Sequence, residues 1–407
     1  MRAPAPDSAS NEKEAFAVNH PSESRPAVPR AVYIHIPFCT NKCYYCDFNS
    51  YVREGQPVMD YLRALEREME KTVRLMPPEG IDTIFVGGGT PTVLTAEEMA
   101  LFLSAVRRHF PFDPERVEFT MEANPGTTDE EKLAVMREFG VNRISFGAQS
   151  FDAGLLKAIG RIHSPDDIRR SLELARKAGF ANLSVDLMLG LPNQTMRQLE
   201  TSVEEALALD VDHCSVYGLK VEENTLFFEW EKQGILPLPE QEEEAEMYRY
   251  VVNRFREAGY RHYEISNFAR PGRESRHNLT YWRNEPYYGL GAGAHGYAGG
   301  VRHVNVKGVS AYIAAVWSGL PRTESIPVSR EEAMEDFMMV GLRLIDGVKD
   351  ADFRRQFGIG LTDAFSDPLR RLVASGLLEE TADGFRLTEK GLLLGNEVFA
   401  EFIGVLV

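Results

Sequence analysis

The sequence predicts an α/β protein whose parallel strands form either a βα barrel or a doubly wound sheet. Short apolar runs alternate with amphipathic helical segments from Val32 onward. In addition, Gly140, Gly179 and Gly259 each follow a helical segment and precede a strand, at intervals of 39 and 80 residues. Glycine at this position allows the left-handed turn that ends a helix. The intervals are about one and two βα units, which is why the strands are expected to be parallel.

Seven segments have the apolar character of buried strands. In chain order they are Val32–Ile36, Thr83–Val86, Val117–Met121, Arg143–Phe146, Leu183–Leu187, Cys214–Tyr217 and Tyr263–Ile265. The segments between them carry apolar residues at helical spacing. Two clear examples are Leu62, Leu65, Met69, Val73 and Met76, and then Met99, Phe102, Leu103, Val106 and Phe110. Three helices are expected to begin with capping boxes, formed by Thr95 with Glu98, Thr128 with Glu131, and Thr195 with Gln198.

The chain divides into four parts on these patterns. Residues 1–30 are expected to be a disordered tail, 31–270 the βα unit, 271–327 a linker segment, and 328–407 a smaller C-terminal domain. The C-terminal domain is expected to contain three helices and then a small hairpin, which resembles a winged helix. The helices are Glu331–Leu344, Ala351–Phe357 and Asp363–Ser375, and the hairpin strands are Leu377–Leu378 and Phe385–Leu387.

Composition excludes several classes of protein. The chain has 45 Lys and Arg residues against 61 Asp and Glu residues, a net charge of -16. Binding to nucleic acid through the phosphate backbone needs basic residues, so no nucleic-acid partner is expected. No apolar run is long enough for a transmembrane segment. The tail lacks the apolar region of a signal peptide and contains acidic residues that transit peptides avoid, which favours a cytoplasmic protein.

Three of the four cysteines lie close together. Cys39, Cys43 and Cys46 follow the first predicted strand in the run Cys39-Thr-Asn-Lys-Cys43-Tyr-Tyr-Cys46, whereas Cys214 is far away in a strand. A structural zinc ion usually takes four ligands. Three close cysteines better suit a 4Fe-4S cluster that leaves one iron open. A zinc site completed by a distant ligand, or three unligated thiols, remain alternatives.

The CxxxCxxC spacing after a first strand resembles the signature of the radical S-adenosylmethionine (SAM) superfamily. The resemblance implies a partial (β/α)6-type radical SAM barrel, with a smaller C-terminal α+β, winged-helix-like domain. It also implies that Cys39, Cys43 and Cys46 hold a 4Fe-4S cluster whose open iron binds SAM. An electron donor would then reduce the cluster, and reduction can cleave SAM into methionine and a deoxyadenosyl radical.

Other segments extend the resemblance along the barrel. Gly87-Gly88-Gly89-Thr90-Pro91 follows the second strand, and Glu122, Gln149 and Asp186 lie at or near the ends of the next three strands. Read alone, each could be a turn, a cap or a structural hydrogen bond. By the resemblance, these residues would contact SAM: Tyr33, Tyr45, Gly88, Gly89, Thr90, Glu122, Gln149, Arg161 and Asp186.

Within the superfamily, the chain is similar to the family that contains oxygen-independent coproporphyrinogen III oxidase and the HemW heme chaperone. The oxidase pattern has a further cysteine where this chain has Phe48, which favours the HemW type. The segment His277-Asn278-Leu-Thr-Tyr281-Trp282, called the His277–Trp282 motif below, matches a motif of the chaperone. The resemblance therefore implies a heme site that includes His277, Asn278, Tyr281 and Trp282. Other possible iron ligands are His35, His262, His295 and His303.

The function implied by this resemblance is that of a heme chaperone, which binds heme and transfers it to acceptor hemoproteins. Membrane respiratory enzymes are candidate acceptors by analogy. The main alternative is an oxygen-independent coproporphyrinogen III oxidase, a radical enzyme that converts propionate side chains of the porphyrinogen to vinyl groups. A zinc-containing structural or interaction protein is a third hypothesis. Because the oxidase and the chaperone share the SAM machinery, SAM binding does not distinguish between them.

Overall fold

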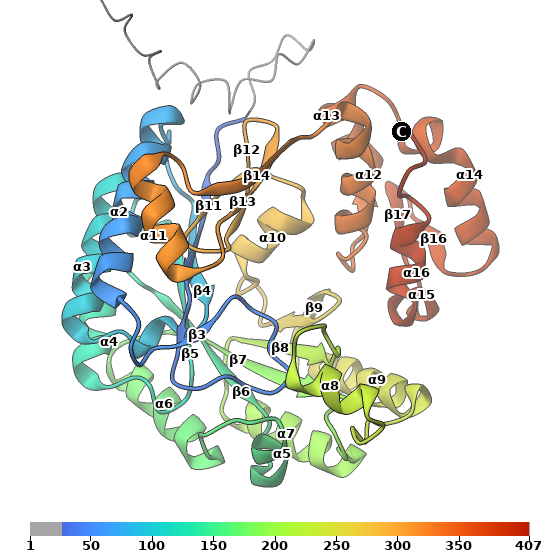
Figure 1. The fold of residues 1–407 in the computed structure, drawn as a ribbon. Helices are drawn as coiled ribbons and strands as arrows, with labels where there is room; N and C mark the ends of the chain where they lie inside the picture. Colours follow the sequence, from blue (N-terminus) through green and yellow to red (C-terminus); the bar gives the residue numbers. More distant parts are fainter. Residues whose placement is uncertain (1–26, 407) are drawn as a thin grey trace, which may run out of the picture.

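The computed structural model describes residues 27–406. The expected disordered tail, 1–30, lies outside the described residues except for its last four. Figure 1 shows a curved sheet with helices on its outer face and a smaller C-terminal domain beside it. Within residues 27–406, none of the helices combines the length and the apolar character that crossing a membrane requires.

Six adjacent parallel strands form the partial barrel. They are β1 (Ala31–Ile36), β4 (Thr83–Gly88), β5 (Glu118–Ala123), β6 (Arg143–Gln149), β7 (Asn182–Leu189) and β8 (His213–Gly218). Each contains one of the segments expected from sequence. Their apolar side chains are buried, as is typical of parallel strands covered by helices. The seventh expected strand corresponds to β9 (Arg261–Glu264), which pairs antiparallel with β10 (Asn267–Ala269).

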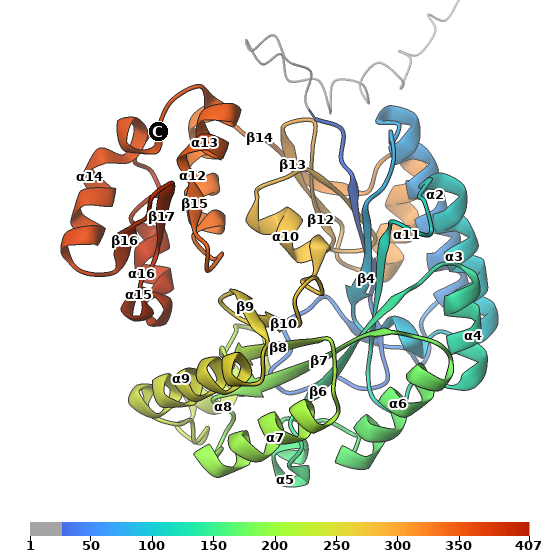
Figure 2. The same ribbon diagram turned by 180° about the vertical axis from the view of Figure 1, so that it is seen from behind.

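Helices cover the outer face of the sheet, as Figures 1 and 2 show from opposite sides. They are α2 (Val58–Leu75), α3 (Ala96–His109), α4 (Glu130–Glu138), α6 (Pro165–Lys177), α7 (Met196–Ala208) and α9 (Gln241–Glu257). Two shorter helices, α5 (Ala153–Ala158) and α8 (Leu226–Lys232), instead form a separate apolar cluster with the cysteine loop. The capping boxes at Thr95 and Thr195 are confirmed. The one at Thr128 is wrong, because helix α4 begins one residue later and Asp129 accepts the backbone N–H bond of Lys132. An Asp carboxylate caps a helix as well as a Thr hydroxyl does, so Asp129 caps α4 in place of Thr128.

Residues 271–327, expected to be a linker, extend the same sheet. The segment contains α10 (Arg276–Trp282), β11 (Tyr287–Leu290), β12 (His295–Ala298), β13 (Val301–Asn305), α11 (Val309–Ser318) and β14 (Arg322–Pro327). Strand β11 pairs in parallel with β1, and β12, β13 and β14 continue from it as an antiparallel meander. The segment therefore lies directly beside the strand that leads into the cysteine loop.

The C-terminal domain has its own apolar core. Its elements are α12 (Arg330–Gly341), β15 (Val348–Lys349), α13 (Asp350–Phe357), α14 (Leu361–Ala374), β16 (Leu378–Glu380), β17 (Gly384–Leu387), α15 (Glu389–Leu393) and α16 (Gly395–Ala400). Strands β15, β17 and β16 form a small sheet. The three helices and the hairpin are those expected from sequence. Arg343, just after α12, joins the domain to the barrel through the fully buried Glu264 carboxylate, with 3.4 Å between the charged atoms.

Candidate functional site

The loop that carries the three cysteines connects β1 to α2 and is fixed by its own polar side chains. Two short strands within it, β2 (Phe38–Cys39) and β3 (Tyr51–Val52), pair in parallel. The Lys42 ammonium closes the loop by donating to the Phe48 carbonyl at 2.8 Å and to the Ser50 hydroxyl at 3.0 Å. The loop is therefore a defined structure at the carboxyl end of the first barrel strand, where ligands bind in α/β folds.

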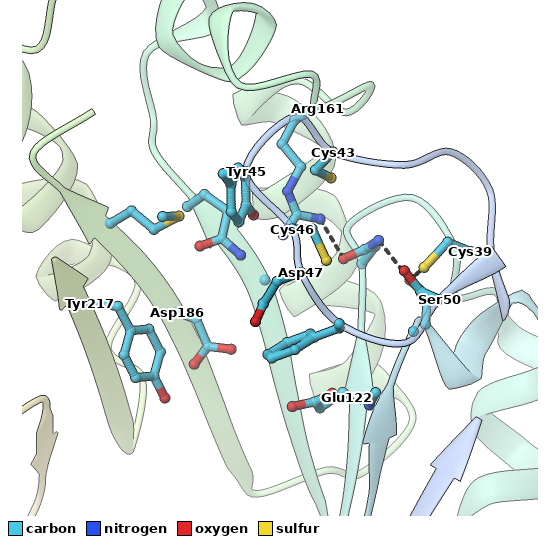
Figure 3. A pocket seen from close by; sticks show the side chains of 18 of the residues that line it. Cys39, Cys43, Tyr45, Cys46, Asp47, Ser50, Glu122, Arg161, Asp186 and Tyr217 are labelled. Atoms are coloured by element: carbon cyan, nitrogen blue, oxygen red, sulfur yellow. Dashed lines mark hydrogen bonds between the residues drawn. The ribbon is translucent and has the colours of Figure 1, made fainter. Parts of the chain in front are cut away.

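All three cysteines line one cavity of about 340 Å³, shown in Figure 3. Burial raises the pKa of the Cys39 and Cys43 thiols. Among residues 27–406, no three His, Cys, Asp or Glu side chains are arranged to hold a single metal ion. In a 4Fe-4S cluster each thiolate binds a different iron, so the three thiols need not converge on one ion. Cys214 is buried within β8 and does not line the cavity.

The glycine run after β4 allows the second strand to pack against the cysteine loop. Gly88 has a φ of +106°, and a Cβ atom there would lie 2.2 Å from the His35 ring. A Cβ on Gly89 would lie 2.6 Å from the Phe38 carbonyl oxygen. The glycines are therefore required by contacts within the protein. Because the chain packs so closely here, Gly88, Gly89 and Thr90 also reach the cavity wall.

Two partly buried carboxylates, those of Glu122 and Asp186, lie on the cavity floor. The Glu122 side chain, from β5, accepts a hydrogen bond from the Gly88 backbone N–H at 3.1 Å. Burial, together with the negative charge of Asp186, raises the pKa of Glu122 to about 7. Burial also raises the pKa of Asp186, whose carboxylate accepts a bond from the Ser145 hydroxyl at 3.1 Å. The floor is therefore an environment in which a cationic ligand would stabilise both ionised carboxylates.

Gln149 lies at an irregular point of β6. The pairing of β6 with β7 shifts register between Gly147 and Gln149, and Gln149 has a φ of +65°. A residue other than glycine rarely adopts this conformation, and such strain is concentrated at functional sites. The bulge changes the direction of the strand end, and Gln149 lines the cavity there.

A chain of polar contacts joins three strand ends above the floor. The Arg161 guanidinium donates to the Asn124 amide oxygen at 2.7 Å, and the Asn124 amide nitrogen donates to the Thr90 hydroxyl at 2.9 Å. The Thr90 hydroxyl also contacts the Cys39 sulfur at 3.6 Å. Figure 3 shows Arg161 beside Cys43. Burial raises the pKa of the Cys43 thiol, and the positive charge of Arg161 offsets part of that rise.

The structure places eight of the nine residues expected to contact SAM around this cavity. They are Tyr45, Gly88, Gly89, Thr90, Glu122, Gln149, Arg161 and Asp186. The ninth, Tyr33, faces a different cavity, and its hydroxyl is hydrogen-bonded to the His35 ring at 2.9 Å. Sequence reasoning missed Asn124, Ser145 and Tyr217. The first two alternate with chosen residues on β5 and β6, so strand periodicity could have found them.

The second cavity lies on the other side of the cysteine loop and has a volume of about 730 Å³. The two cavities share Cys46, Asp47, Phe48 and Ser50 as wall residues. The rest of the second wall comes from β1, from the cysteine loop, from Glu223 and Asn224 after β8, and from the segment around β11 and β12. That last segment contributes Tyr281, Tyr287, His295 and Lys307. It is therefore an independent space that borders the cysteine loop.

The His277–Trp282 motif forms helix α10, and its side chains point to different places. His277 is fully buried, and its ring nitrogens are hydrogen-bonded to the Thr83 hydroxyl at 2.9 Å and the Tyr281 hydroxyl at 2.8 Å. Tyr281 reaches the second cavity, but Trp282 packs against the C-terminal domain, with the Arg343 guanidinium 4.4 Å from its ring centre. Asn278 lies on α10 outside both cavity walls. Both nitrogens of the His277 imidazole are therefore engaged in hydrogen bonds within the protein, and its expected role as an iron ligand stays a prediction.

Comparison with known proteins follows the division into two domains. A model of the radical SAM superfamily matches residues 33–206, and a model of the HemN C-terminal domain matches residues 328–394. The heme chaperone HemW of Bacillus subtilis (strain 168) is 47% identical, over 93% of this chain and 100% of that protein. The heme chaperone HemW of Escherichia coli (strain K12) is 35% identical, over 92% and 98%. The solved structure of coproporphyrinogen III oxidase (HemN) from Escherichia coli, described as a radical SAM enzyme, has a TM-score of 0.83 at 25% identity, over 97% of this chain and 93% of that one.

Proposed function

Because the chain belongs to the HemW family of the radical SAM superfamily, we propose that it binds heme and transfers it to acceptor hemoproteins. The relatives named heme chaperones match this chain over nearly their whole length, which supports extending their role to it. Hemoproteins of membrane respiratory chains are acceptors that fit this role. The observation that carries heme binding is the cavity of about 730 Å³, which lies within the range of small-molecule and cofactor sites.

The smaller cavity would hold a 4Fe-4S cluster and SAM. Cys39, Cys43 and Cys46 would bind three irons, and the fourth iron would face the cavity that Glu122, Gln149 and Asp186 line. When bound and reduced by an electron donor, the cluster supplies one-electron chemistry to SAM. The chain's own contribution is to place three thiols beside a positive guanidinium and to set two partly buried carboxylates below them. Those carboxylates would attract the positively charged sulfonium and amino groups of SAM.

The position of Phe48 favours a chaperone over an oxidase. Phe48 stands where the oxidase pattern has its additional cysteine, and its side chain is 60% exposed in the wall between the two cavities. An exposed aromatic ring offers apolar surface to a flat macrocycle and no ligand to a metal. The second cavity would thus receive heme as cargo beside the cluster loop.

Heme titration and enzyme turnover measured on one sample test this proposal. The chain is purified and reconstituted with iron and sulfide without oxygen, and heme is added while the absorption spectrum is recorded. One equivalent of tightly bound heme, and its release to an apo-hemoprotein, would support the chaperone. Conversion of coproporphyrinogen III to protoporphyrinogen at enzyme-like rates, in the presence of SAM and reductant, would instead establish the oxidase.

A further inference from the structure

We propose that His295 is an axial ligand of heme iron in the second cavity and that Lys307 pairs there with a heme propionate. This inference rests on the proposed heme binding and adds the site and the ligand. It also gives the His277–Trp282 motif a different role, which is to shape the wall of the cavity.

The hydrogen bonds of the histidines single out His295. Among the histidines in residues 27–406, His35, His213 and His277 have both ring nitrogens hydrogen-bonded. His163, His262 and His303 are buried, and each has one nitrogen bonded to a backbone carbonyl. His109 lies on α3 beside Glu66, away from both cavities. Only His295, of those that the structure describes, lines a cavity with neither nitrogen hydrogen-bonded, so its imidazole can bind iron without breaking a contact.

The backbone holds His295 at the cavity edge. His295 begins β12, directly after a turn in which Gly291 and Gly293 have φ values of +100° and +74°. Asn49 of the cysteine loop ties this turn down by donating from its amide nitrogen to the Ala292 and Lys307 carbonyls, each at 2.8 Å. Rigid placement of a ligand by such surrounding hydrogen bonds is a common property of metal sites.

The rest of the wall has the chemistry of a porphyrin site. Aromatic rings of Tyr33, Tyr51, Tyr281 and Tyr287 line it, and the Phe48 ring is exposed at its border. Aromatic surfaces of this kind pack against flat, apolar macrocycles. The Lys307 side chain is exposed and makes no ion pair among the described residues. Burial, and then the positive charge of Lys307, lower the pKa of the His295 imidazole. Asp47 and Glu223 also line the wall, but neither forms an ion pair with Lys307, so a propionate of the ligand can supply the opposite charge.

His277 acts here through Tyr281. Its Nε2 atom lies 2.8 Å from the Tyr281 hydroxyl, and the Tyr281 ring meets the Tyr287 ring edge to face, with 4.7 Å between ring centres. Both tyrosines line the cavity. His277 is therefore a positioning residue, and changing it should loosen the wall while leaving the iron ligand in place.

The test is heme titration of the anaerobically reconstituted full chain carrying His295→Ala, His295→Gln, His277→Phe or, as a matched control, His109→Ala. Absorption and electron paramagnetic resonance spectra identify the axial ligand. We expect both His295 variants to lose the histidine-ligated spectrum and to bind heme at least tenfold more weakly, with added imidazole restoring the spectrum to His295→Ala. His277→Phe should keep that spectrum with reduced affinity, and His109→Ala should match the wild type.

The outcomes separate this inference from the proposed function. Wild-type spectra in both His295 variants, with tight heme binding retained, would overturn the assignment of His295 and leave heme binding intact. A wild type that binds no heme would overturn the proposed function as well. Because His295 is exposed and makes no side-chain hydrogen bond, its variants should keep the wild-type iron content and unfolding temperature, and these two measurements exclude misfolding as the cause of a loss.

Discussion

His277 and Tyr281, one helical turn apart on α10, share a hydrogen bond of 2.8 Å between the imidazole Nε2 atom and the phenolic oxygen. The other ring nitrogen reaches Thr83 on β4, and the ring stacks on Phe85 with 5.2 Å between centres. The imidazole thus connects α10 to the barrel interior. Burial lowers its pKa to about 3, so it is neutral in the folded chain at neutral pH.

The first prediction concerns acid stability. Because His277 titrates near its ordinary pKa of about 6.5 when the chain is unfolded, protons bind preferentially to the unfolded state below that pH. The contribution of His277 to stability is therefore present above about pH 6.5 and is lost as the pH falls toward about 3. His277→Gln should flatten this part of the stability curve, measured by urea unfolding from pH 7 to pH 4. Arg107→Gln, which changes an exposed residue of α3 and no histidine, is the control, and an unchanged slope in His277→Gln would contradict the prediction.

The second prediction concerns the pH dependence of SAM binding. The Glu122 carboxyl, with a pKa of about 7, is largely protonated at pH 6 and ionised at pH 8. Its charge should therefore strengthen the binding of cationic SAM as the pH rises, by a factor of up to about ten. Calorimetric titration of the cluster-containing protein at both pH values measures this effect. In Glu122→Gln, any remaining pH dependence of the SAM affinity comes from SAM or from other groups. The same pH dependence in the variant and the wild type would refute the role of Glu122.

The third prediction concerns iron content. Replacing Cys39, Cys43 or Cys46 singly by Ala should reduce iron from about four atoms per chain to well below that value, because each thiolate holds a separate iron. Cys214→Ala should retain the full content, since Cys214 is buried within β8. Iron and sulfide analysis after oxygen-free reconstitution provides the measurement. Full iron in any of the three cysteine variants would remove that residue from the ligand set.

The fourth prediction concerns the junction between the two domains. Arg343→Met leaves the fully buried Glu264 without its guanidinium partner and should cost about 3 kcal/mol of stability. The double variant with Glu264→Gln should recover part of that loss, because no buried charge is then left unpaired. Arg355→Met, which removes an exposed ion pair with Asp352, should have an effect below about 0.5 kcal/mol. Urea unfolding measures all three, and equal losses in Arg343→Met and Arg355→Met would show that the junction pair contributes little.

The sequence allowed the barrel strands to be predicted because parallel strands are buried on both faces, so their apolar runs stand out. Strand β11 was not expected, because it is four residues long and its sequence, Tyr287-Tyr-Gly-Leu290, lies in a glycine-rich stretch. Glycine is depleted in strands, and only the pairing with β1 gives this segment its structure.

The cluster cavity was largely predictable, whereas the surroundings of His277 were not. The family resemblance named Glu122, Gln149 and Asp186, and they line one cavity because the ends of parallel strands meet at one edge of the sheet. The burial of His277 depends on Thr83, which is 194 positions away in the sequence. A local sequence pattern cannot predict a contact between residues so far apart. The motif therefore identified the residue types but not the direction in which each side chain points.

The segment from Cys46 to Ser50 forms a wall that both cavities share. Any substitution that shifts its backbone changes the shape of both cavities. A change that improves ligand binding in one cavity must therefore preserve binding in the other. Because it lines both cavities, this segment should tolerate insertions less well than the neighbouring turn at Arg53–Gln56. If the cluster and heme bind as proposed, loss of the cluster would also change the shape of the second cavity.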